Sequence, residues 1–229
     1  DPRLIVLLHG TSASLHTWEG WAGALKDKRR VIRFDLPGFG LTGPAPDNVY
    51  ALDSYVRFVI AMLDKLGVQR CVLGGNSFGG YVAWVTALEA PGRVGKLILV
   101  DAGGYPLVST SVPIGFRIAR LPVLNRIAGY TLPRGVIESS VRNVYGNPSL
   151  VTPELIDLYF DITVRAGNRK ALVQRIAQAP ADAQAERIVE VGVPTLILWG
   201  GRDRLIPVEN AHRFQRDIAG SQLVVFDDL

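Results

Sequence analysis

The sequence predicts an α/β fold, a mostly parallel sheet flanked by helices, with a helical lid inserted between two strands. Over most of the chain, short continuous runs of Val, Ile and Leu alternate with helix-like stretches, as in a parallel sheet covered on both faces. From about residue 106 to residue 190, prolines punctuate the sequence and the strand pattern stops. A chain of 229 residues is long enough to bury one sizeable core.

Six apolar runs lack the alternation of a half-exposed strand, and we expect each to form a strand of this sheet. They are Leu4–Leu8, Val31–Phe34, Cys71–Gly75, Leu97–Val100, Thr195–Trp199 and Leu223–Phe226. Helices are expected between them, at about Thr17–Lys26, Asp53–Leu66, Ser77–Ala90 and Val208–Ala219. For the second of these helices, Asp53 is the predicted N-cap and Gly67 the C-terminal stop.

The predicted core consists of residues 1–105 and 191–229, and the predicted lid or cap of residues 106–190. Within the lid, Thr152 precedes Pro153, which predicts a helix start because proline fits the first helical position. A lid placed between two strands would cover the site at the strand ends. We therefore expect apolar lid residues to form the pocket walls, with these candidates: Ile114, Phe116, Leu121, Val123 and Leu124.

Composition narrows the classes of function. The net charge of +4 comes from scattered arginines rather than from a basic cluster interleaved with aromatics, so we expect no nucleic-acid partner. The apolar runs fall far short of the ~20 residues that span a bilayer. The single cysteine, Cys71, excludes an internal disulfide, is expected to be buried and inert, and fits a reducing cytoplasm. The composition leaves the oligomeric state open.

A cofactor or metal ion is not expected. The segment Gly38-Phe39-Gly40-Leu41-Thr42-Gly43 fits a dinucleotide-binding pattern, but prolines follow where a helix would have to begin. The histidines, the cysteine and the carboxylates nowhere show the spacing of a metal site.

The chemistry centres on Gly75-Asn76-Ser77-Phe78-Gly79, a G-x-S-x-G pattern. The bare pattern is weak evidence, but here a buried strand runs into it and an apolar helix leaves it, as a nucleophile elbow requires. A serine on so sharp a turn has strained backbone angles, and glycines two residues away on either side avoid collisions. The pattern predicts Ser77 as a nucleophile, with the helix start adding positive potential for an oxyanion.

The loop after the first strand reads His9-Gly10-Thr11. Attack on an acyl carbonyl creates a negative oxygen that needs two preorganised N–H donors. We expect one donor at the backbone of Phe78, directly after the nucleophile, and the other at the backbone of Thr11. His9 and Gly10 are expected to support this loop, with His9 bracing the turn through hydrogen bonds rather than acting as a base.

A carboxylate that could complete a triad follows the fifth predicted strand, in Trp199-Gly200-Gly201-Arg202-Asp203. Asp203 can there orient a histidine and stabilise its cation. Two alternatives stay open. Asp203 could pair with Arg202 or Arg204 on a surface loop, and Asp101, after the fourth predicted strand, is a rival position for the acid.

These motifs resemble those of the α/β-hydrolase superfamily, in its compact esterase and carbon–carbon-bond hydrolase branch. Four features match in order: the His9-Gly10 loop, the turn Phe34–Gly40, the elbow at Ser77, and the segment Trp199–Asp203. The resemblance spans the chain and is loosest in the lid. It implies a triad in the chain order Ser, Asp, His, which Ser77 and Asp203 obey.

The resemblance places the catalytic histidine after the strand that follows the acid. His9, His16 and His212 do not occupy that place, although His16 could line the pocket. We therefore expect the sequence to be N- and C-terminally incomplete, with the histidine within about six residues beyond Leu229. The polypeptide as printed is accordingly expected to be nearly inactive.

The expected function is serine-dependent hydrolysis of small to medium apolar carboxylic esters, with a small-molecule ester or related carbonyl compound as substrate. The nearest alternative is hydrolysis of a carbon–carbon bond in ring-cleavage products, because related enzymes with that activity resemble this chain at the elbow. Perhydrolysis on the same triad is a third. A homologue that binds a small ligand without turnover is an alternative of a different class.

Overall fold

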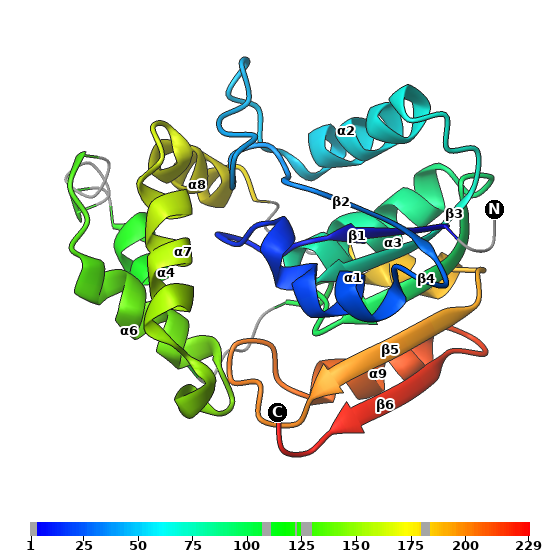
Figure 1. The fold of residues 1–229 in the computed structure, drawn as a ribbon. Coiled ribbons are helices and arrows are strands. Elements are labelled where there is room, and N and C mark those ends of the chain that lie inside the picture. The colour runs from blue at the N-terminus through cyan, green and yellow to red at the C-terminus, as the bar shows by residue number, and fades with distance from the viewer. Residues whose placement is uncertain (1–3, 107–110, 122, 125–129, 180–183) are drawn as a thin grey trace.

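The computed structural model describes residues 4–106, 111–121, 123–124, 130–179 and 184–229. Its described strands form one parallel sheet in the order β2-β1-β3-β4-β5-β6 (Figure 1). Their bounds are β1 Leu4–Leu8, β2 Arg30–Phe34, β3 Cys71–Asn76, β4 Val94–Val100, β5 Thr195–Gly200 and β6 Gln222–Phe226. The prediction of a parallel sheet with six strands is confirmed.

Helices cover both faces of this sheet. The short helix η1 (Leu15–Trp18) and α1 (Glu19–Leu25) lie on one face, and α2 (Leu52–Lys65), α3 (Phe78–Glu89) and α9 (Glu209–Asp217) pack on the other. The side chains of β1 divide between the faces: Ile5 and Leu7 contact the cluster around Trp18, whereas Val6 and Leu8 join the large cluster beneath α2 and α3. β1 is therefore buried on both sides.

The last strand differs from the expectation of two covered faces. Exposure alternates along β6, where Val224 and Phe226 are 43% and 45% exposed. β6 is an edge strand with α9 behind it (Figure 1), so the side chains on its other face meet solvent. A run of apolar residues predicted the strand correctly but not its place at the edge.

The predicted N-cap of α2 is wrong. Asp53 is the second residue of the helix rather than its cap, which is Ala51, and the carboxylate forms an ion pair with Arg57 one turn further on. The predicted stop is confirmed, because Gly67 follows the helix at φ +64°, a left-handed conformation that glycine adopts without strain.

A helical insertion lies between β4 and β5. It contains α4 (Ile114–Arg120), α6 (Arg134–Val144), η2 (Pro148–Leu150), α7 (Pro153–Val164), α8 (Asn168–Ala177) and η3 (Ala185–Glu190). Thr152 caps α7 through a bond from the Leu155 amide, with Pro153 at the first helical position as predicted. In Figure 1 the helices α4 to α8 stand beyond the carboxyl ends of the strands.

The strand register brings four loops to one edge of the sheet. Leu8 of β1 lies opposite Gly75 of β3, Asn76 lies opposite Val100 of β4, and Val100 lies opposite Leu198 of β5. The loops that follow these strands therefore start side by side and face the helical insertion. In open α/β sheets this carboxyl edge is the usual place of a ligand site.

Candidate active site

Ser77 occupies the one-residue corner between β3 and α3 in a strained conformation. Its φ of +54° and ψ of −117° lie in a region that non-glycine residues rarely adopt. Neighbouring backbone holds it there: the Ser77 amide donates to the Val100 carbonyl at 3.0 Å, and the Ser77 carbonyl accepts from the Gly103 amide at 2.9 Å. The end of β4 thus fixes the corner.

The glycines around this corner are sterically required. A Cβ at Gly75 would lie 2.1 Å from the Gly79 carbonyl oxygen, and one at Gly79 would lie 2.3 Å from the Leu8 carbonyl oxygen. A Cβ at Gly10 would come within 3.1 Å of the Ser77 Cβ. The loop after β1 therefore touches the corner directly. The contacts at Gly75 and Gly79 involve backbone atoms, which cannot rotate away as a side chain could.

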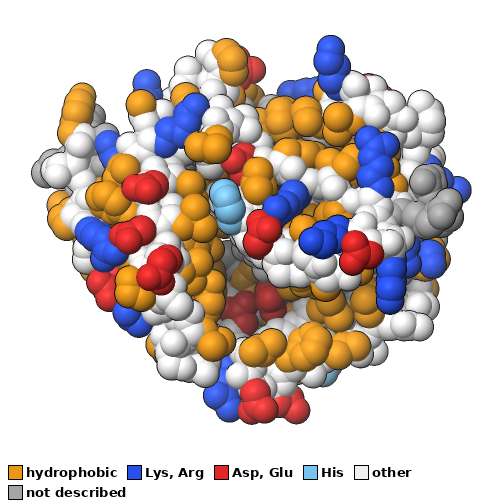
Figure 2. Space-filling model, viewed as in Figure 1, with side chains coloured by type: hydrophobic (Ala, Val, Ile, Leu, Met, Phe, Trp, Pro, Cys, Tyr) orange, Lys and Arg blue, Asp and Glu red, His pale blue; other side chains and the backbone are white. Residues whose placement is uncertain are grey.

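A cavity of about 970 Å³ opens in front of Ser77. Figure 2 shows it as a hollow between the insertion and the sheet, with hydrophobic side chains along the insertion and acidic ones at its depth. Five of the residues singled out in the sequence line it: Gly10, Thr11, Ser77, Phe78 and Asp203. Of the predicted apolar walls, Phe116 lines the cavity, whereas Ile114, Leu121, Val123 and Leu124 are exposed and do not.

The loop after β1 is held by His9. The buried imidazole donates from Nδ1 to the Gly10 carbonyl at 2.8 Å and accepts at Nε2 from the Leu36 amide at 2.9 Å. Burial lowers the pKa of His9, so the ring is neutral and both nitrogens are engaged. The same loop carries Thr11 at the cavity wall, while the Phe78 amide, as the first in α3, has no acceptor within the helix.

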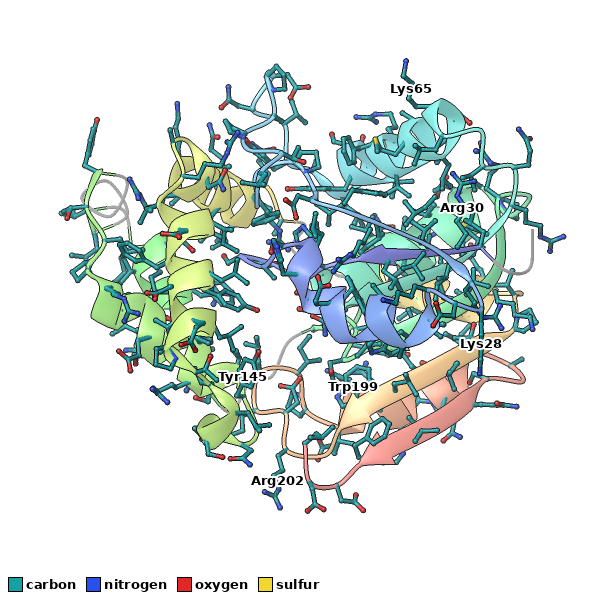
Figure 3. The ribbon with its side chains drawn as sticks, viewed as in Figure 1. Lys28, Arg30, Lys65, Tyr145, Trp199 and Arg202 are labelled. Atoms are coloured by element: carbon teal, nitrogen blue, oxygen red, sulfur yellow. The ribbon has the colours of Figure 1, made fainter. Side chains whose placement is uncertain are left out.

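Asp203 reaches the cavity from the loop after β5. Its Oδ1 accepts from the amides of Leu205 and Ile206 at 2.7 and 2.9 Å, which fixes the carboxylate, and burial raises its pKa. Arg202 points away from the sheet, toward solvent (Figure 3), and pairs with Asp228 at 3.0 Å. Pairing of Asp203 with Arg202 is therefore not what this structure shows.

A second carboxylate, Asp101, lines the same cavity. It follows β4 at φ +45°, and its Oδ1 accepts from the Gly200 amide at 2.8 Å. Burial, opposed by that hydrogen bond and reinforced by the charge of Asp203, raises the Asp101 pKa to about 7. The two acids thus share one electrostatic environment, and burial raises the pKa of both.

The three histidines lie outside the cavity wall. His9 is buried behind the loop, His16 is exposed with its Nδ1 3.0 Å from Ser14 Oγ, and His212 is exposed on α9. The residues after β6 contact the loop that carries Asp203, because the Arg202 amide donates to the Leu229 carbonyl at 2.6 Å.

Arg175 and Tyr145 line the cavity, although neither was singled out from the sequence. Arg175 of α8 lines the cavity with its guanidinium carbon 3.8 Å from the centre of the Phe78 ring. Tyr145, at the end of α6, lies on the face of the insertion toward the sheet (Figure 3) and lines the cavity too. No local pattern distinguishes Arg175 from the other arginines of the insertion, since its burial depends on how α8 docks.

Two further features bear on the class of protein. In the described parts of the chain, no three His, Cys, Asp or Glu side chains are grouped so as to hold a metal ion. Among the same residues, no helix combines the length and the apolar character that crossing a membrane requires.

Comparisons with known proteins agree with this architecture. The 2-hydroxy-6-oxo-2,4-heptadienoate hydrolase of Pseudomonas putida is 33% identical over 97% of this chain and 80% of its own length. A meta-cleavage product hydrolase structure from Pseudomonas fluorescens IP01 gives a TM-score of 0.82 at 28% identity, covering 99% of this chain and 82% of that one. A thermophilic esterase from Thermogutta terrifontis gives 0.79 at 26% identity, covering 97% and 80%.

A family model matches almost the whole chain, over residues 3–229, and describes the α/β-hydrolase fold. The relatives named above are hydrolases. The chain belongs to the α/β-hydrolase family.

Proposed function

We propose that this protein is a serine hydrolase that cleaves carboxylic esters of small to medium size by two-step acyl transfer. The conformation of Ser77 carries the proposal: a non-glycine residue at φ +54°, on the wall of a cavity and at the start of a helix. Such strain persists only where the surrounding structure enforces it, and it is typical of a nucleophile elbow.

In the first step, Ser77 Oγ attacks the ester carbonyl carbon while its proton passes to a base. The negative oxygen of the tetrahedral intermediate accepts from the amides of Phe78 and Thr11, each contributing roughly 3 kcal/mol to lowering the barrier. The bond to the alcohol oxygen then breaks, and the alcohol leaves with the proton. In the second step, water attacks the acyl-enzyme by the reverse proton route and releases the acid.

The base in this proposal is a histidine between Ser77 and Asp203, carried by chain that follows β6. The position of Leu229 supports this placement, since its carbonyl accepts from the Arg202 amide beside the acid loop. Both described bonds to Asp203 engage Oδ1, so Oδ2 would accept from the imidazole Nδ1–H. We assign the acid to Asp203 rather than Asp101, because at pH 7 about half of Asp101 would be protonated.

Hydrolysis of a carbon–carbon bond in ring-cleavage products is the second candidate. The similarity to hydrolases of that kind favours it, at 33% identity for one relative and a TM-score of 0.82 for one structure. The similarity to an esterase structure, at a TM-score of 0.79, supports ester hydrolysis as the first candidate. Both reactions use a nucleophilic serine and an oxyanion site, so the corner at Ser77 serves either.

The test compares two substrates with the full-length gene product, its Ser77→Ala variant and its Asp203→Asn variant. With 4-nitrophenyl butyrate we expect kcat to fall by on the order of 10⁶-fold in Ser77→Ala and by about 10⁴-fold in Asp203→Asn. Release of 4-nitrophenolate measures it, and circular dichroism checks that the variants fold.

The second substrate is 2-hydroxy-6-oxohepta-2,4-dienoate. A kcat/KM for this compound far above that for the ester would replace ester hydrolysis by the second candidate. Ester turnover that survives in Ser77→Ala would remove the proposed nucleophile. Binding of either compound without turnover would make the protein a ligand-binding member of the family instead.

A further inference from the structure

Arg175 brings a cation into the cavity wall, and no acidic side chain of the described residues pairs with it. Its Nε is buried and has no hydrogen-bond partner within the described residues, and its guanidinium stacks on the Phe78 ring at 3.8 Å. Burial lowers its pKa to about 10, opposed by the nearby Tyr55, so the group stays charged at neutral pH. Neither Asp101 nor Asp203 contributes to this shift, although both line the same cavity.

The position of Arg175 is fixed because α8 is fastened to the core at both ends. At its start, the Asn168 side chain donates to the Gly40 carbonyl at 3.0 Å. At its end, the Gln178 side chain accepts from the Tyr50 amide at 2.7 Å and donates to the Asn48 carbonyl at 3.0 Å. These bonds tie the helix that carries Arg175 to the loop before α2, and Asn168 also donates to the Ile162 carbonyl of α7 at 2.7 Å.

An unpaired guanidinium in a partly buried place is costly, and an anion that enters the cavity would offset that cost. The planar group offers parallel N–H donors that match a carboxylate in two-point contact. Its neighbour Phe78 supplies the proposed oxyanion amide. A carboxylate at Arg175 would thus lie within a few bonds of the carbonyl that Ser77 attacks.

We propose that Arg175 binds a carboxylate of the substrate, so that the preferred substrates are acyl compounds with a second, acidic group near the cleaved bond. This specificity rests on the proposed function, because it takes the Ser77 corner as the reacting centre. It changes the expected substrate from a purely apolar ester to one with an apolar body and one anionic end.

The test measures kcat and KM for mono-4-nitrophenyl succinate, mono-4-nitrophenyl glutarate and the neutral 4-nitrophenyl butyrate. In Arg175→Gln we expect kcat/KM for the better anionic ester to fall roughly 10- to 100-fold, mainly through KM. For the butyrate we expect a change of less than about threefold, since no charge is bound. Arg175→Lys keeps the charge and should recover part of the loss.

Lys170→Gln is the matched control, because Lys170 lies exposed on the same helix, outside the cavity wall, and carries the same charge. Lys170→Gln should leave kcat/KM for all three esters unchanged. Equal losses on anionic and neutral esters, or no loss in Arg175→Gln, would overturn the inference while Ser77-dependent turnover still supported the proposed function.

Calorimetry distinguishes failure of the carboxylate site from failure of the proposed function. We expect glutarate to bind the Ser77→Ala protein and to lose at least about tenfold in affinity when Arg175→Gln is added. If the full-length protein turns over no substrate at all, the proposed function fails but this binding result still supports the carboxylate site. If glutarate affinity does not depend on Arg175, the site is refuted whatever the activity.

Discussion

Asp101 combines a left-handed backbone with a charge that the fold disfavours. Few non-glycine residues have its φ of +45°, although aspartate adopts such values more often than most, and its carboxyl lies beside Asp203 in a partly enclosed cavity. Sites that keep such features are often functional. In this chain both acids line the cavity that Ser77 also lines.

Replacing Asp101 with Asn should stabilise the protein, and more so at high pH. Because the pKa rises from 3.8 to about 7 on folding, the folded protein holds a proton that the unfolded chain releases, and the free energy of unfolding falls as pH rises between these values. Asp101→Asn removes this loss. We expect the gain to be roughly 3 to 4 kcal/mol larger at pH 8 than at pH 4.

Urea unfolding of both proteins at the two pH values measures the difference. The neutral amide keeps an oxygen for the Gly200 amide, so the variant should fold normally. Asp27→Asn, at an exposed position, is the control and should show no pH-dependent gain. A gain of the same size at both pH values would mean that folding does not raise the pKa of Asp101.

At the scale of elements, the junction of β3 with α3 requires glycine at residue 75, because backbone lies where a side chain would stand. In Gly75→Ala the new Cβ would lie 2.1 Å from the Gly79 carbonyl oxygen, and no side-chain rotation relieves that contact. We expect a loss of at least about 3 kcal/mol, seen as a lower Tm or as failure to fold.

Gly23 provides the opposite case within a helix. A Cβ at Gly23 in α1 meets no atom within 4 Å, so Gly23→Ala should raise stability by about 0.5–1 kcal/mol through helix propensity. Thermal unfolding measures the Tm of Gly75→Ala and of Gly23→Ala against that of the parent protein. Similar Tm values for Gly75→Ala and the parent protein would show that the corner can relax.

The elements that the sequence predicted best are those fixed by local pattern. The central strands were predicted to within a few residues because continuous apolar runs mark them, and β4 begins earlier than expected because Gly95 and Lys96 interrupt its run while pairing with β3 continues. The Asp53 cap failed because the helix begins at Leu52, two residues earlier than a cap at Asp53 requires. The burial of Arg175 depends on contacts between distant segments, which one sequence does not display.

For the site, the sequence indicated which loops matter, and the fold placed them along one edge. Thr11, Ser77 and Asp203 come from three loops that the parallel register brings to one cavity. Their catalytic roles stay predictions. The sequence pointed to both acids but could not show the raised pKa of Asp101, because that shift depends on burial and on the distance between two loops.

For the molecule as a whole, the cavity lies between two parts of the chain, the sheet edge and the helical insertion. Its volume of about 970 Å³ is at the upper end of the range for small-molecule sites. Val144, at the end of α6, lines it and is 42% exposed, so a larger side chain fits there without crowding a core.

Val144→Trp should therefore shorten the longest acyl chain that the protein accepts. We expect kcat/KM for 4-nitrophenyl octanoate to fall by about tenfold and that for the acetate to change little, because one methylene in a pocket is worth about 1 kcal/mol. Val189→Trp, at an exposed position outside the cavity, should leave the profile unchanged. An unchanged profile in Val144→Trp would place the acyl chain elsewhere.

The apolar contacts of the insertion fall into two clusters. Ile137 of α6, Ile156 of α7 and Val151 between them belong to a small cluster, whereas Ala171 of α8 belongs to the large cluster beneath α2 and α3. The side chains of the small cluster can therefore change without altering the packing around Ser77. A lineage could remodel α6 and α7 to reshape the cavity and still inherit the corner at Ser77 and the position of Arg175.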